Sequence, residues 1–412
     1  MIKHRSNCRL CNSKQVIKIF DLGEMPLAGN FLSKNEIGKE KKYPLRVFFC
    51  KNCSLVQVLD IIPKEELFTK YFYLSSVTKT LSNHFKEYAK EMVNRFLIPG
   101  KSFVLEIGSN DGVLQEPLEK LDIKTLGIEP AVNISRFARK KGLEVINDYF
   151  SKKLAEKIKK ERGQVDAIFA NNVFAHMDSI RDVTKGIKLL LKKDGIFVFE
   201  VHYIVDLIEK LQYDTIYHEH MCYYSLTSLS KFFESFNMEI FDVKKIPIHA
   251  GSIRIYVKNK DQRLKNISKN VKKILKYEKD NGFDSLQRYL NFSIEVRNHR
   301  DKLKKTLTDL KKKNKKIVGY GAPGRGNILL NYCSLGPDIL DYIIDESPIR
   351  KGMFIPGMHI PIISPEKFRK NNPDYALILA WSYKQEIFKK EKKFIENGGK
   401  FIIPLPKIKQ YP

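Results

Sequence analysis

Short apolar runs alternate with charged stretches of helical length through the middle of the chain. The runs lie at 103–107, 125–128, 144–146, 167–170 and 196–201. Alternation of strand-length apolar runs with charged helices is typical of an α/β fold with a parallel, doubly wound sheet. We therefore predict such a sheet between residues 102 and 201.

A second, smaller alternation follows near the C-terminus. Apolar runs at 317–320, 339–344 and 376–379 are separated by turn residues, and the first run leads into a glycine turn at Gly321. This pattern predicts a second α/β sheet, of Rossmann type.

Helical periodicity marks the segments beside these sheets. Apolar side chains at helical spacing predict an amphipathic helix over 79–97, and a further helix is expected over 226–236. A hairpin is expected at 239–257, and 261–315 is expected to form a long helical bridge. The apolar stripe of that bridge consists of Leu286, Tyr289, Leu290, Ile294, Leu303, Leu307 and Leu310.

Four of the six cysteines form two Cys-x-x-Cys pairs, Cys8 with Cys11 and Cys50 with Cys53. Two such pairs can place four thiolates at the corners of one tetrahedron, which is the geometry of structural Zn²⁺. A redox motif is the alternative, but it would belong to a βαβ pattern that this region lacks, and it would leave the second pair unexplained. We predict a structural zinc site.

A chain of 412 residues exceeds the size of a single hydrophobic core, so several domains are expected. We place a zinc-binding domain at 1–61, a doubly wound domain at 62–260, and a helical bridge with a C-terminal Rossmann-like domain at 261–412. The first module can bury little apolar surface, so the metal is expected to supply much of its stability.

Composition narrows the class of protein further. The hydrophobic fraction is 43%, and no apolar run reaches the length of about 18–20 residues that spans a membrane. The first twenty residues contain no apolar secretory segment. We expect a cytoplasmic protein without a membrane partner.

The net charge of +27 invites a nucleic-acid interpretation. The lysines, however, lie in runs such as 157–160 and 311–313, which suit solvated helix faces. They are not interleaved with aromatic residues as in a single-strand binding groove. We therefore expect no nucleic-acid partner, and the same charge would attract a nucleotide diphosphate.

The first strand of the middle sheet ends in a turn, 104–112, that resembles motif I of class I S-adenosylmethionine methyltransferases. Glycines let the backbone approach the methionine and ribose closely, and a carboxylate at the strand end can bind the ammonium group. Glu129 follows about twenty residues later, where an acid accepts bonds from ribose hydroxyls. Asp148, after the third strand, is placed to bind the adenine amino group.

NAD(P) is the competing cofactor for a strand–turn–helix of this kind. The turn lacks the Gly-x-Gly-x-x-Gly spacing that a pyrophosphate requires, so S-adenosylmethionine is favoured and 62–260 is interpreted as a methyltransferase domain. The predicted cofactor-binding residues are Glu106, Gly108, Asn110, Asp111, Gly112, Glu129, Asp148 and Asn171.

Tyr217, His218, Glu219 and His220 are consecutive, and such side chains are costly to bury without a purpose. In an extended segment, His218 and His220 would point to one face and Tyr217 and Glu219 to the other. A histidine is a suitable base for a carbon acid, and a nearby carboxylate can orient it. A second metal site, with His176 as a further ligand, is the alternative.

Together with further motifs, these features resemble a known family. The further motifs lie at 247–254, 319–327, 331–333, 356–361 and 379–381. In this order, and over nearly the whole chain, they look like the S-adenosylmethionine-dependent sugar C-methyltransferases that make branched deoxysugars such as tetronitrose, mycarose and noviose.

The resemblance implies a zinc-binding N-terminal domain, an S-adenosylmethionine-binding middle domain and a Rossmann-like C-terminal domain. It implies a nucleotide-linked 4-keto-6-deoxy sugar, usually dTDP-linked, as the substrate in a cleft between domains. The histidine that matches His220 is the favoured base, and the pocket is lined by Tyr71, His176, Tyr217 and Glu219. The substrate-binding residues are expected to be Tyr71, His176, Arg254, Gly321, Arg325 and Asn327.

Two positions depart from the family pattern. The C-terminal turn reads Ala-Pro-Gly-Arg-Gly at 322–326, where many members have small residues and a lysine, and His202 stands where proline is more usual. Both departures could change which sugar fits without changing the chemistry. The turn at 319–327 either holds the diphosphate, with Arg325, or is a structural turn that binds nothing.

The mechanistic hypothesis is that His220 removes a proton beside the 4-keto group while Tyr217 or His176 donates a hydrogen bond to the enolate oxygen. Methylation at C3 is favoured over C5. The alternatives are a zinc-containing RNA methyltransferase and a non-enzymatic zinc-dependent scaffold. The first leaves the C-terminal domain and the Tyr217–His220 cluster without a task. A monomer is the expected oligomeric state.

Overall fold

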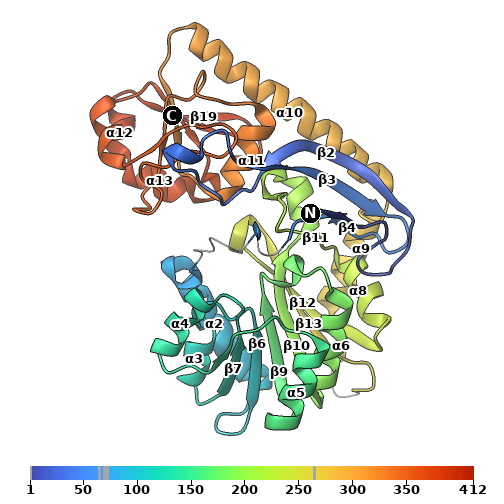
Figure 1. Cartoon of the computed structure of the whole chain (residues 1–412). Helices are drawn as coiled ribbons and strands as arrows, with labels where there is room; N and C mark the ends of the chain where they lie inside the picture. The colour runs from blue at the N-terminus through green and yellow to red at the C-terminus, as the bar shows by residue number, and fades with distance from the viewer. Residues whose placement is uncertain (1, 64–65, 68–73, 263–265) are drawn as a thin grey trace.

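The computed structural model describes residues 2–63, 66–67, 74–262 and 266–412, and a seven-stranded sheet from the middle of the chain forms its lower part in Figure 1. In spatial order its strands are β12 (Met238–Ile246), β13 (Ser252–Asn259), β10 (Leu191–His202), β9 (Val165–Asn171), β6 (Phe103–Ile107), β7 (Lys124–Ile128) and β8 (Val145–Ile146). The strands from β10 to β8 are parallel, and β13 runs antiparallel beside β10. The predicted parallel sheet is confirmed, with the expected hairpin at its edge.

The direction of the chain across this sheet reverses between β6 and β9. The chain first moves outward from β6 to β7 and β8, and then returns to β9 on the other side of β6. Open parallel sheets bind ligands at the carboxyl ends of their strands, at such a switch point. The ends of β6 and β9, which carry Glu106 and Asn171, therefore lie where a ligand is expected.

Helices cover both faces of the seven-stranded sheet (Figure 1). They are α2 (Lys79–Phe96), α3 (Gln115–Glu119), α4 (Val132–Lys140), α5 (Lys152–Arg162), α6 (Ile180–Leu190) and α8 (Leu226–Glu234), whereas α7 (Ile204–Glu209) follows the end of β10 and lines a small cavity with residues of the N-terminal sheet. Helix α2 buries Leu81, Phe85, Tyr88 and Met92, as their spacing predicts. The Thr78 side chain caps this helix by accepting a hydrogen bond from the Leu81 backbone N–H.

A four-stranded antiparallel sheet forms the N-terminal domain. Its strands, in spatial order, are β11 (Cys222–Tyr223), β4 (Val56–Val58), β3 (Lys42–Cys50) and β2 (Val16–Pro26). A separate pair joins β1 (Lys3–His4) to β5 (Asp60–Ile61). Strand β11 comes from a segment far along the chain, so the N-terminal sheet is completed by residues that follow His220.

The C-terminal domain contains a six-stranded sheet. Its strands, in spatial order, are β16 (Ile362–Ile363), β15 (Ile343–Ile344), β14 (Ile317–Tyr320), β17 (Tyr375–Ile378), β18 (Lys400–Ile403) and β19 (Lys409–Tyr411). All but β19 are parallel, and the accompanying helices are α11 (Gly324–Cys333), α12 (Pro365–Asn371), α13 (Lys384–Lys390) and α14 (Lys392–Glu396). The expected Rossmann-like sheet is present.

The helical bridge is broken in two, α9 (Lys269–Asp280) and α10 (Leu286–Lys312), and Gly282 turns the chain between them with a φ of +70°. Helix α10 lies along the N-terminal sheet (Figure 1), where the Phe292 ring meets Phe20 and the Tyr289 ring meets Phe49. The stripe prediction is wrong at Ile294, which is 49% exposed. The face of α10 that packs on the sheet instead buries Tyr289, Phe292, Val296, Leu303 and Leu307.

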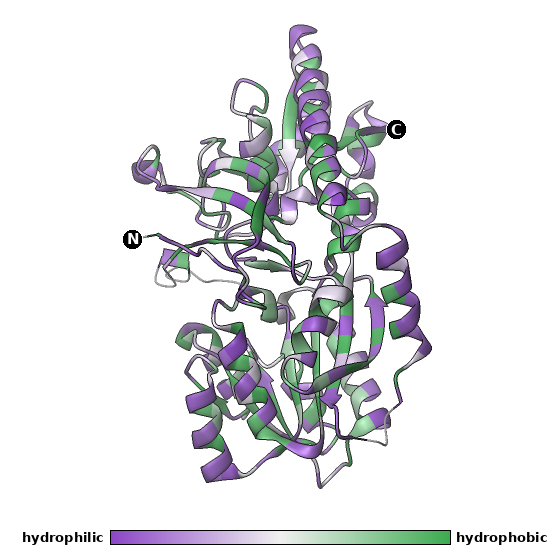
Figure 2. Cartoon of the chain, turned by 90° about the vertical axis from the view of Figure 1, so that its right-hand side faces the viewer, coloured by the Kyte–Doolittle hydropathy of each residue, from purple (hydrophilic) through white to green (hydrophobic). Residues whose placement is uncertain are grey.

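Hydropathy follows this layering. Figure 2 shows hydrophobic residues along the strands and hydrophilic residues on the outer surfaces of the helices. Among the helices of the described residues, none combines the length and apolar character needed to cross a membrane.

Candidate active site

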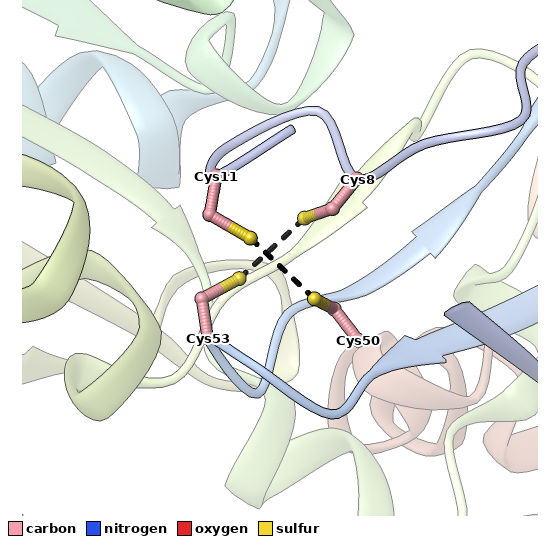
Figure 3. Close-up of side chains that lie close together, drawn as sticks. All are labelled: Cys8, Cys11, Cys50 and Cys53. Carbon is pink, nitrogen blue, oxygen red and sulfur yellow. Dashed lines mark hydrogen bonds between the residues drawn. The ribbon is translucent and has the colours of Figure 1, made fainter. Parts of the chain in front are cut away.

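Four cysteine side chains from the N-terminal domain converge on one point (Figure 3). The Sγ atoms of Cys8 and Cys53 are 3.5 Å apart, those of Cys11 and Cys50 are 3.6 Å apart, and all four lie within 4.8 Å of one another. Zinc–sulfur bonds of about 2.3 Å place the sulfurs of a tetrahedral site roughly 3.8 Å apart. The four thiols therefore fit a closed zinc site, which agrees with the prediction from their spacing.

The turn after β6 brings the backbone close to a neighbouring loop. Gly108 has a φ of +69°, and a Cβ there would lie 2.4 Å from Cγ1 of Val173, so only glycine fits. Gly112 has a φ of +79° and would meet the Leu143 side chain. Glu129, at the end of β7, holds the turn by accepting hydrogen bonds from the backbone N–H groups of Asn110 (3.0 Å) and Ala131 (2.9 Å).

Acidic and amide side chains gather at this switch point. Burial, together with the Asp111 and Glu129 carboxylates, raises the pKa of Glu106 well above its ordinary value. Asn171 donates a hydrogen bond of 3.4 Å to one Glu106 oxygen. The acceptors Glu106 Oε2, Asp111 Oδ1 and Asn171 Oδ1 are buried and have no protein partner. Such a site is complementary to a positively charged ligand.

S-adenosylmethionine fits this set of acceptors, because it carries an ammonium and a sulfonium group. Glu106, Asp111 and Asn171 would hold its charged end, and the turn from Gly108 to Gly112 would pass beside it. Asp148 is exposed, follows β8, and accepts a hydrogen bond of 2.7 Å from the Tyr149 backbone N–H. Its predicted contact with the adenine amino group stays a prediction.

Binding of S-adenosylmethionine is expected to lower the raised pKa of Glu106 and to release the proton that this raised pKa retains, because a bound cation favours the charged form of the carboxyl group. Isothermal titration calorimetry in two buffers of different ionisation enthalpy measures this release. Glu106→Gln should remove the buffer dependence and weaken binding by about 10- to 100-fold. Equal apparent enthalpies in both buffers for the wild-type protein would contradict the prediction.

Four histidine side chains form a cluster beside the cofactor turn, in which His220 is buried and the other three are half-buried. They are His176 in η3 (Phe174–His176), His202 at the end of β10, His220, and His249 in η5 (Ile248–Ala250). The centroid of the His220 ring lies 5.0 Å from that of His176 and 4.9 Å from that of His202. The centroids of the His202 and His249 rings are 5.5 Å apart. The cluster sits at the carboxyl ends of β9 and β10, next to the strand that carries the cofactor turn.

The segment around His220 is a turn rather than an extended strand. The His220 backbone N–H donates to the Tyr217 carbonyl at 2.9 Å, and the Tyr217 ring contacts the His220 ring at a tilt of 35°, with centroids 3.9 Å apart. His218 points instead to the N-terminal domain, where its Nε2 lies 3.3 Å from the Tyr43 carbonyl oxygen. The predicted alternation of faces is therefore wrong, because the turn places Tyr217 and His220 together and separates them from His218.

His220 is held in one tautomer. Its Nδ1 lies 2.9 Å from the Thr215 carbonyl oxygen, which can only accept, so Nδ1 carries the proton and Nε2 keeps its lone pair. Burial and the neighbouring histidines lower the pKa of His220 well below its ordinary value, so the imidazole is neutral at physiological pH. Burial raises the pKa of Glu219 to about 7. Because Nδ1 of His220 already carries a proton and the ring is neutral, Nε2 is the nitrogen that can accept a further proton.

His202 and His249 complete the cluster, although neither was among the predicted site residues. His249 has a φ of +55° and the next residue, Ala250, a φ of +68°. Two successive left-handed residues other than glycine store backbone strain of order 1–3 kcal/mol each, which is typical of functional sites. The sequence signals were the departure at His202 and the motif at 247–254, but neither indicated that the two rings meet.

The alternative of a second metal site is not supported. Among the described residues, the four cysteines are the one group of three or more His, Cys, Asp or Glu side chains whose ligand atoms converge. The histidine rings around His220 therefore belong to a neutral cluster and not to a ligand set.

Two of the remaining predicted residues, Tyr71 and Arg254, are not placed in the site by the structure. Tyr71 lies outside the described residues. Arg254 is 2% exposed and is bound by Glu200 and Glu91, with its guanidinium 3.4 Å from the Tyr88 ring centroid. This network belongs to the interior of the sheet, so the place of Arg254 does not support the predicted substrate contact.

Arg325 reaches from the C-terminal turn to the segment before His220. Its Nε and Nη2 donate to the two carboxylate oxygens of Asp214 at 2.8 and 2.9 Å, and Trp381 Nε1 donates to the same carboxylate at 2.9 Å. Gly321, with a φ of +82°, starts the turn, and Asn327 is buried in α11 with its Nδ2 atom unpartnered. The sequence did not indicate that Asp214 is the partner of Arg325.

Acid is expected to destabilise the protein. Burial lowers the pKa values of His176, His218 and His249 to about 4, whereas the unfolded chain has ordinary values near 6.5. Above pH 7 these groups contribute no pH dependence. As the pH falls from about 6.5 towards 4, each histidine lowers the free energy of unfolding by up to about 1.4 kcal/mol per pH unit, because only the unfolded chain binds the proton.

Urea unfolding at pH 7, 6 and 5 measures this loss. His249→Asn is a suitable variant, because asparagine adopts the left-handed conformation of this position more readily than most residues. Its stability should fall less steeply with acid than that of the wild type. An unchanged slope would show that His249 does not remain neutral in the folded protein.

Three parts of the chain match protein-family descriptions. Residues 8–68 match "Putative zinc binding domain", residues 81–243 match "Methyltransferase domain", and residues 247–406 match "C-methyltransferase C-terminal domain". The chain is 33% identical to "C-methyltransferase NovU" from Streptomyces niveus over an alignment of 407 residues. This alignment covers 98% of this chain and 97% of that protein.

Similar solved structures cover the middle of the chain. Magnesium protoporphyrin IX methyltransferase from Synechocystis PCC 6803 with bound SAM is 12% identical, with 43% of this chain and 78% of that chain covered and a TM-score of 0.33. The PH0226 protein from Pyrococcus horikoshii OT3 is 14% identical, with 48% and 100% covered and a TM-score of 0.38. Both likenesses are too low to carry an argument about this chain.

Proposed function

Because the chain belongs to the S-adenosylmethionine-dependent sugar C-methyltransferases, we propose that it methylates a carbon next to the 4-keto group of a nucleotide-linked 6-deoxy sugar. The carbon is C3, and the nucleotide is dTDP. The observation that carries the proposal is the placement of a buried, neutral histidine with a defined tautomer, His220, in a histidine cluster at the strand ends beside the cofactor turn.

Methylation of carbon requires an electron-rich carbon, and a ketone supplies one after loss of an adjacent proton. In the proposed mechanism, His220 Nε2 accepts the proton from C3, and the C–H electron pair moves onto the carbonyl oxygen as an enolate. S-adenosylmethionine, when bound, would supply the electrophilic methyl group to which the enolate carbon forms its new C–C bond as the S–C bond of the cofactor breaks. The imidazolium that results is stabilised by the Thr215 carbonyl oxygen, which accepts the hydrogen bond from Nδ1–H.

The enolate oxygen requires a hydrogen-bond donor in a site from which water is excluded. Tyr217 and His176 both lie against the His220 ring, so either side chain can reach an oxygen attached to the carbon next to the base. His176 is neutral, since burial lowers its pKa to about 4, and it can donate through one ring nitrogen. We assign oxyanion stabilisation to these two residues.

The diphosphate of the substrate is assigned to the turn at 321–326, at the N-terminus of α11. Backbone N–H groups at a helix N-terminus bind phosphate oxygens. Arg325 uses Nε and Nη2 to bind Asp214, so Nη1 is the nitrogen assigned to the phosphate. Asp214 remains buried beneath the arginine and fixes its orientation.

The proposed function is tested by incubating the purified protein with S-adenosylmethionine and a panel of nucleotide 4-keto-6-deoxy sugars. Mass spectrometry should detect one added CH₂ on the dTDP-linked member, and NMR should place it on C3. Bulk RNA forms the second arm of the experiment, because a zinc-containing RNA methyltransferase is the alternative. Methylation of RNA, or the absence of methylation on any sugar of the panel, would overturn the proposal.

A further inference from the structure

Arg9 lies between Cys8 and Cys11 in the sequence, but its side chain contacts Asp178 and Met221 rather than the cysteines. The side chain is completely buried. A buried guanidinium is stable only when acceptors surround it, because an unpaired buried charge costs several kcal/mol. The acceptors around Arg9 therefore show what this residue holds.

The acceptors of Arg9 lie next to two histidines of the active site. Its Nη1 donates to the Met221 carbonyl at 3.3 Å, and its Nε donates to Asp178 Oδ1 at 3.1 Å. Met221 directly follows His220, and Asp178 lies two residues after His176. One guanidinium thus binds both segments that carry the rings assigned to proton transfer and oxyanion stabilisation.

These two segments also bind each other at the same place. The Met221 backbone N–H donates to the Ala175 carbonyl at 2.9 Å, which ties the residue after His220 to the residue before His176. The Met221 carbonyl also accepts a hydrogen bond of 3.0 Å from the Val58 backbone N–H, at the start of the β4–β11 pairing. The backbone after His220 is therefore an integral part of the zinc domain.

Arg9 is held within the zinc domain, in the turn between two of the four cysteines. Its backbone N–H donates to Gln57 Oε1 at 3.0 Å, and Nη1 also donates to the Val58 carbonyl at 2.9 Å. The turn from Cys8 to Cys11 would be closed by two bonds to the metal, so loss of the metal frees the backbone from which the arginine extends. Metal binding and the placement of His220 are then linked through one side chain.

The segment before His220 is held from the opposite side. Asp214 is bound by Arg325 and Trp381 of the C-terminal domain, and the next residue, Thr215, supplies the carbonyl that holds His220 Nδ1. Residues 214–221 are thus fixed at one end by the C-terminal domain and at the other by Arg9.

We propose that Arg9 is a positioning residue that couples the zinc centre to the orientation of His220 and His176. This inference rests on the proposed function for its kinetic readout and on the geometry alone for its structural readout. The zinc domain then acts on catalysis as well as on folding, because a misplacement of about 1 Å at a base can cost about 10²-fold in rate.

Arg9→Met tests the proposal, and Arg5→Met is the matched control. Arg5 belongs to the same domain and donates to the same Asp178 oxygen at 2.9 Å, but it lies on the surface side of that carboxylate and is not among the donors to Met221. We expect Arg9→Met to retain zinc and to lower kcat by about 10- to 100-fold, with KM changed by less than about threefold. Arg5→Met should retain nearly the full rate.

A second readout does not depend on turnover. In protein labelled with ¹⁵N-histidine, the His220 signals are assigned by their absence from His220→Asn, and the wild type should show the Nδ1-protonated tautomer. The signals should shift or broaden in Arg9→Met and not in Arg5→Met. If no sugar is methylated by the wild type but this difference appears, the positioning role stands and the proposed function fails.

Arg9→Lys keeps the charge and most of the stem but cannot donate to several acceptors in one plane, so it should reproduce the loss if Arg9→Met does not fold. Unchanged kcat and unchanged His220 signals in a folded, zinc-loaded Arg9 variant would overturn the proposal. Loss of zinc from both Arg9→Met and Arg9→Lys would also overturn the proposal, since Arg9 would then serve the metal centre and not the histidines.

Discussion

Replacing His220 by asparagine is expected to lower kcat by about 10²–10⁴-fold, because the proposed reaction would lose the group that accepts the C3 proton. Asparagine can still bind the Thr215 carbonyl, so the local backbone should be retained. The affinity for S-adenosylmethionine should be nearly unchanged, since the acceptors at the cofactor turn belong to Glu106, Asp111 and Asn171. Steady-state kinetics and calorimetric titration measure the two quantities separately.

His218→Asn is the matched control for this experiment. His218 is also a buried histidine of the same turn, but it contacts Tyr43 in the N-terminal domain. This variant should keep most of the activity and lose only stability. Hydrogen exchange sharpens the comparison, because the wild type in D₂O should place deuterium on C3 of the ketosugar and His220→Asn should not. Equal rates in the wild type and His220→Asn would show that another group is the base.

Replacing Cys50 by serine is expected to release the zinc ion and unfold the N-terminal domain. Structural zinc contributes about 10–16 kcal/mol of apparent binding free energy in small metal-dependent domains, and this energy is coupled to folding. The serine hydroxyl is a poor zinc ligand compared with a thiolate. The three remaining cysteines would therefore leave one corner of the tetrahedral site without a protein ligand. The bound metal should fall from about one zinc per chain to nearly none, and the melting temperature should fall with it.

Cys333→Ser provides the control, because Cys333 is a buried thiol in the C-terminal domain, outside the cysteine tetrad. Its Sγ lies 3.4 Å from the Tyr213 hydroxyl, and serine retains a hydrogen-bonding atom there. This variant should keep its zinc. Metal content is measured by atomic absorption and stability by circular dichroism. Full zinc content in Cys50→Ser would exclude the tetrad as the metal site.

The loss of zinc should also affect the active site, since the strand after His220 belongs to the zinc domain's sheet. Val58 and Arg9 both bind the carbonyl of Met221. Removal of the metal by a chelator should therefore disturb His220 even where the seven-stranded sheet remains folded. If zinc served only the local structure of the N-terminal domain, its removal would leave His220 unchanged.

Local patterns in the sequence were sufficient for several features. The spacing within Cys8–Cys11 and Cys50–Cys53 predicted the metal site, because two residues between thiols suit a single ion wherever the pairs meet. The alternation of apolar and charged segments predicted the parallel sheets, since burial on both faces requires continuous apolar strands. Gly108 and Glu129 were found because each follows a strand whose end was already predicted.

Interactions between distant segments were decided by the tertiary structure. Arg254 lies opposite Glu200 because of the register between β13 and β10, and no local pattern encodes a register between strands. Ile294 is exposed because the N-terminal sheet meets a neighbouring face of α10. The turn at Tyr217–His220 forms because the following residues pair with β4.

The sequence by itself determined the composition of the protein's sites: which residues can bind a metal, which turn can accept a cationic cofactor, and which side chains can move a proton. Only the tertiary structure decided their partners, for it brought His202 and His249 to His220, Asp214 to Arg325, and Arg9 to Met221. The reason is physical. Residue type and spacing define the chemistry of neighbours along the chain, whereas the partner of a buried charge or ring depends on how separate sheets pack.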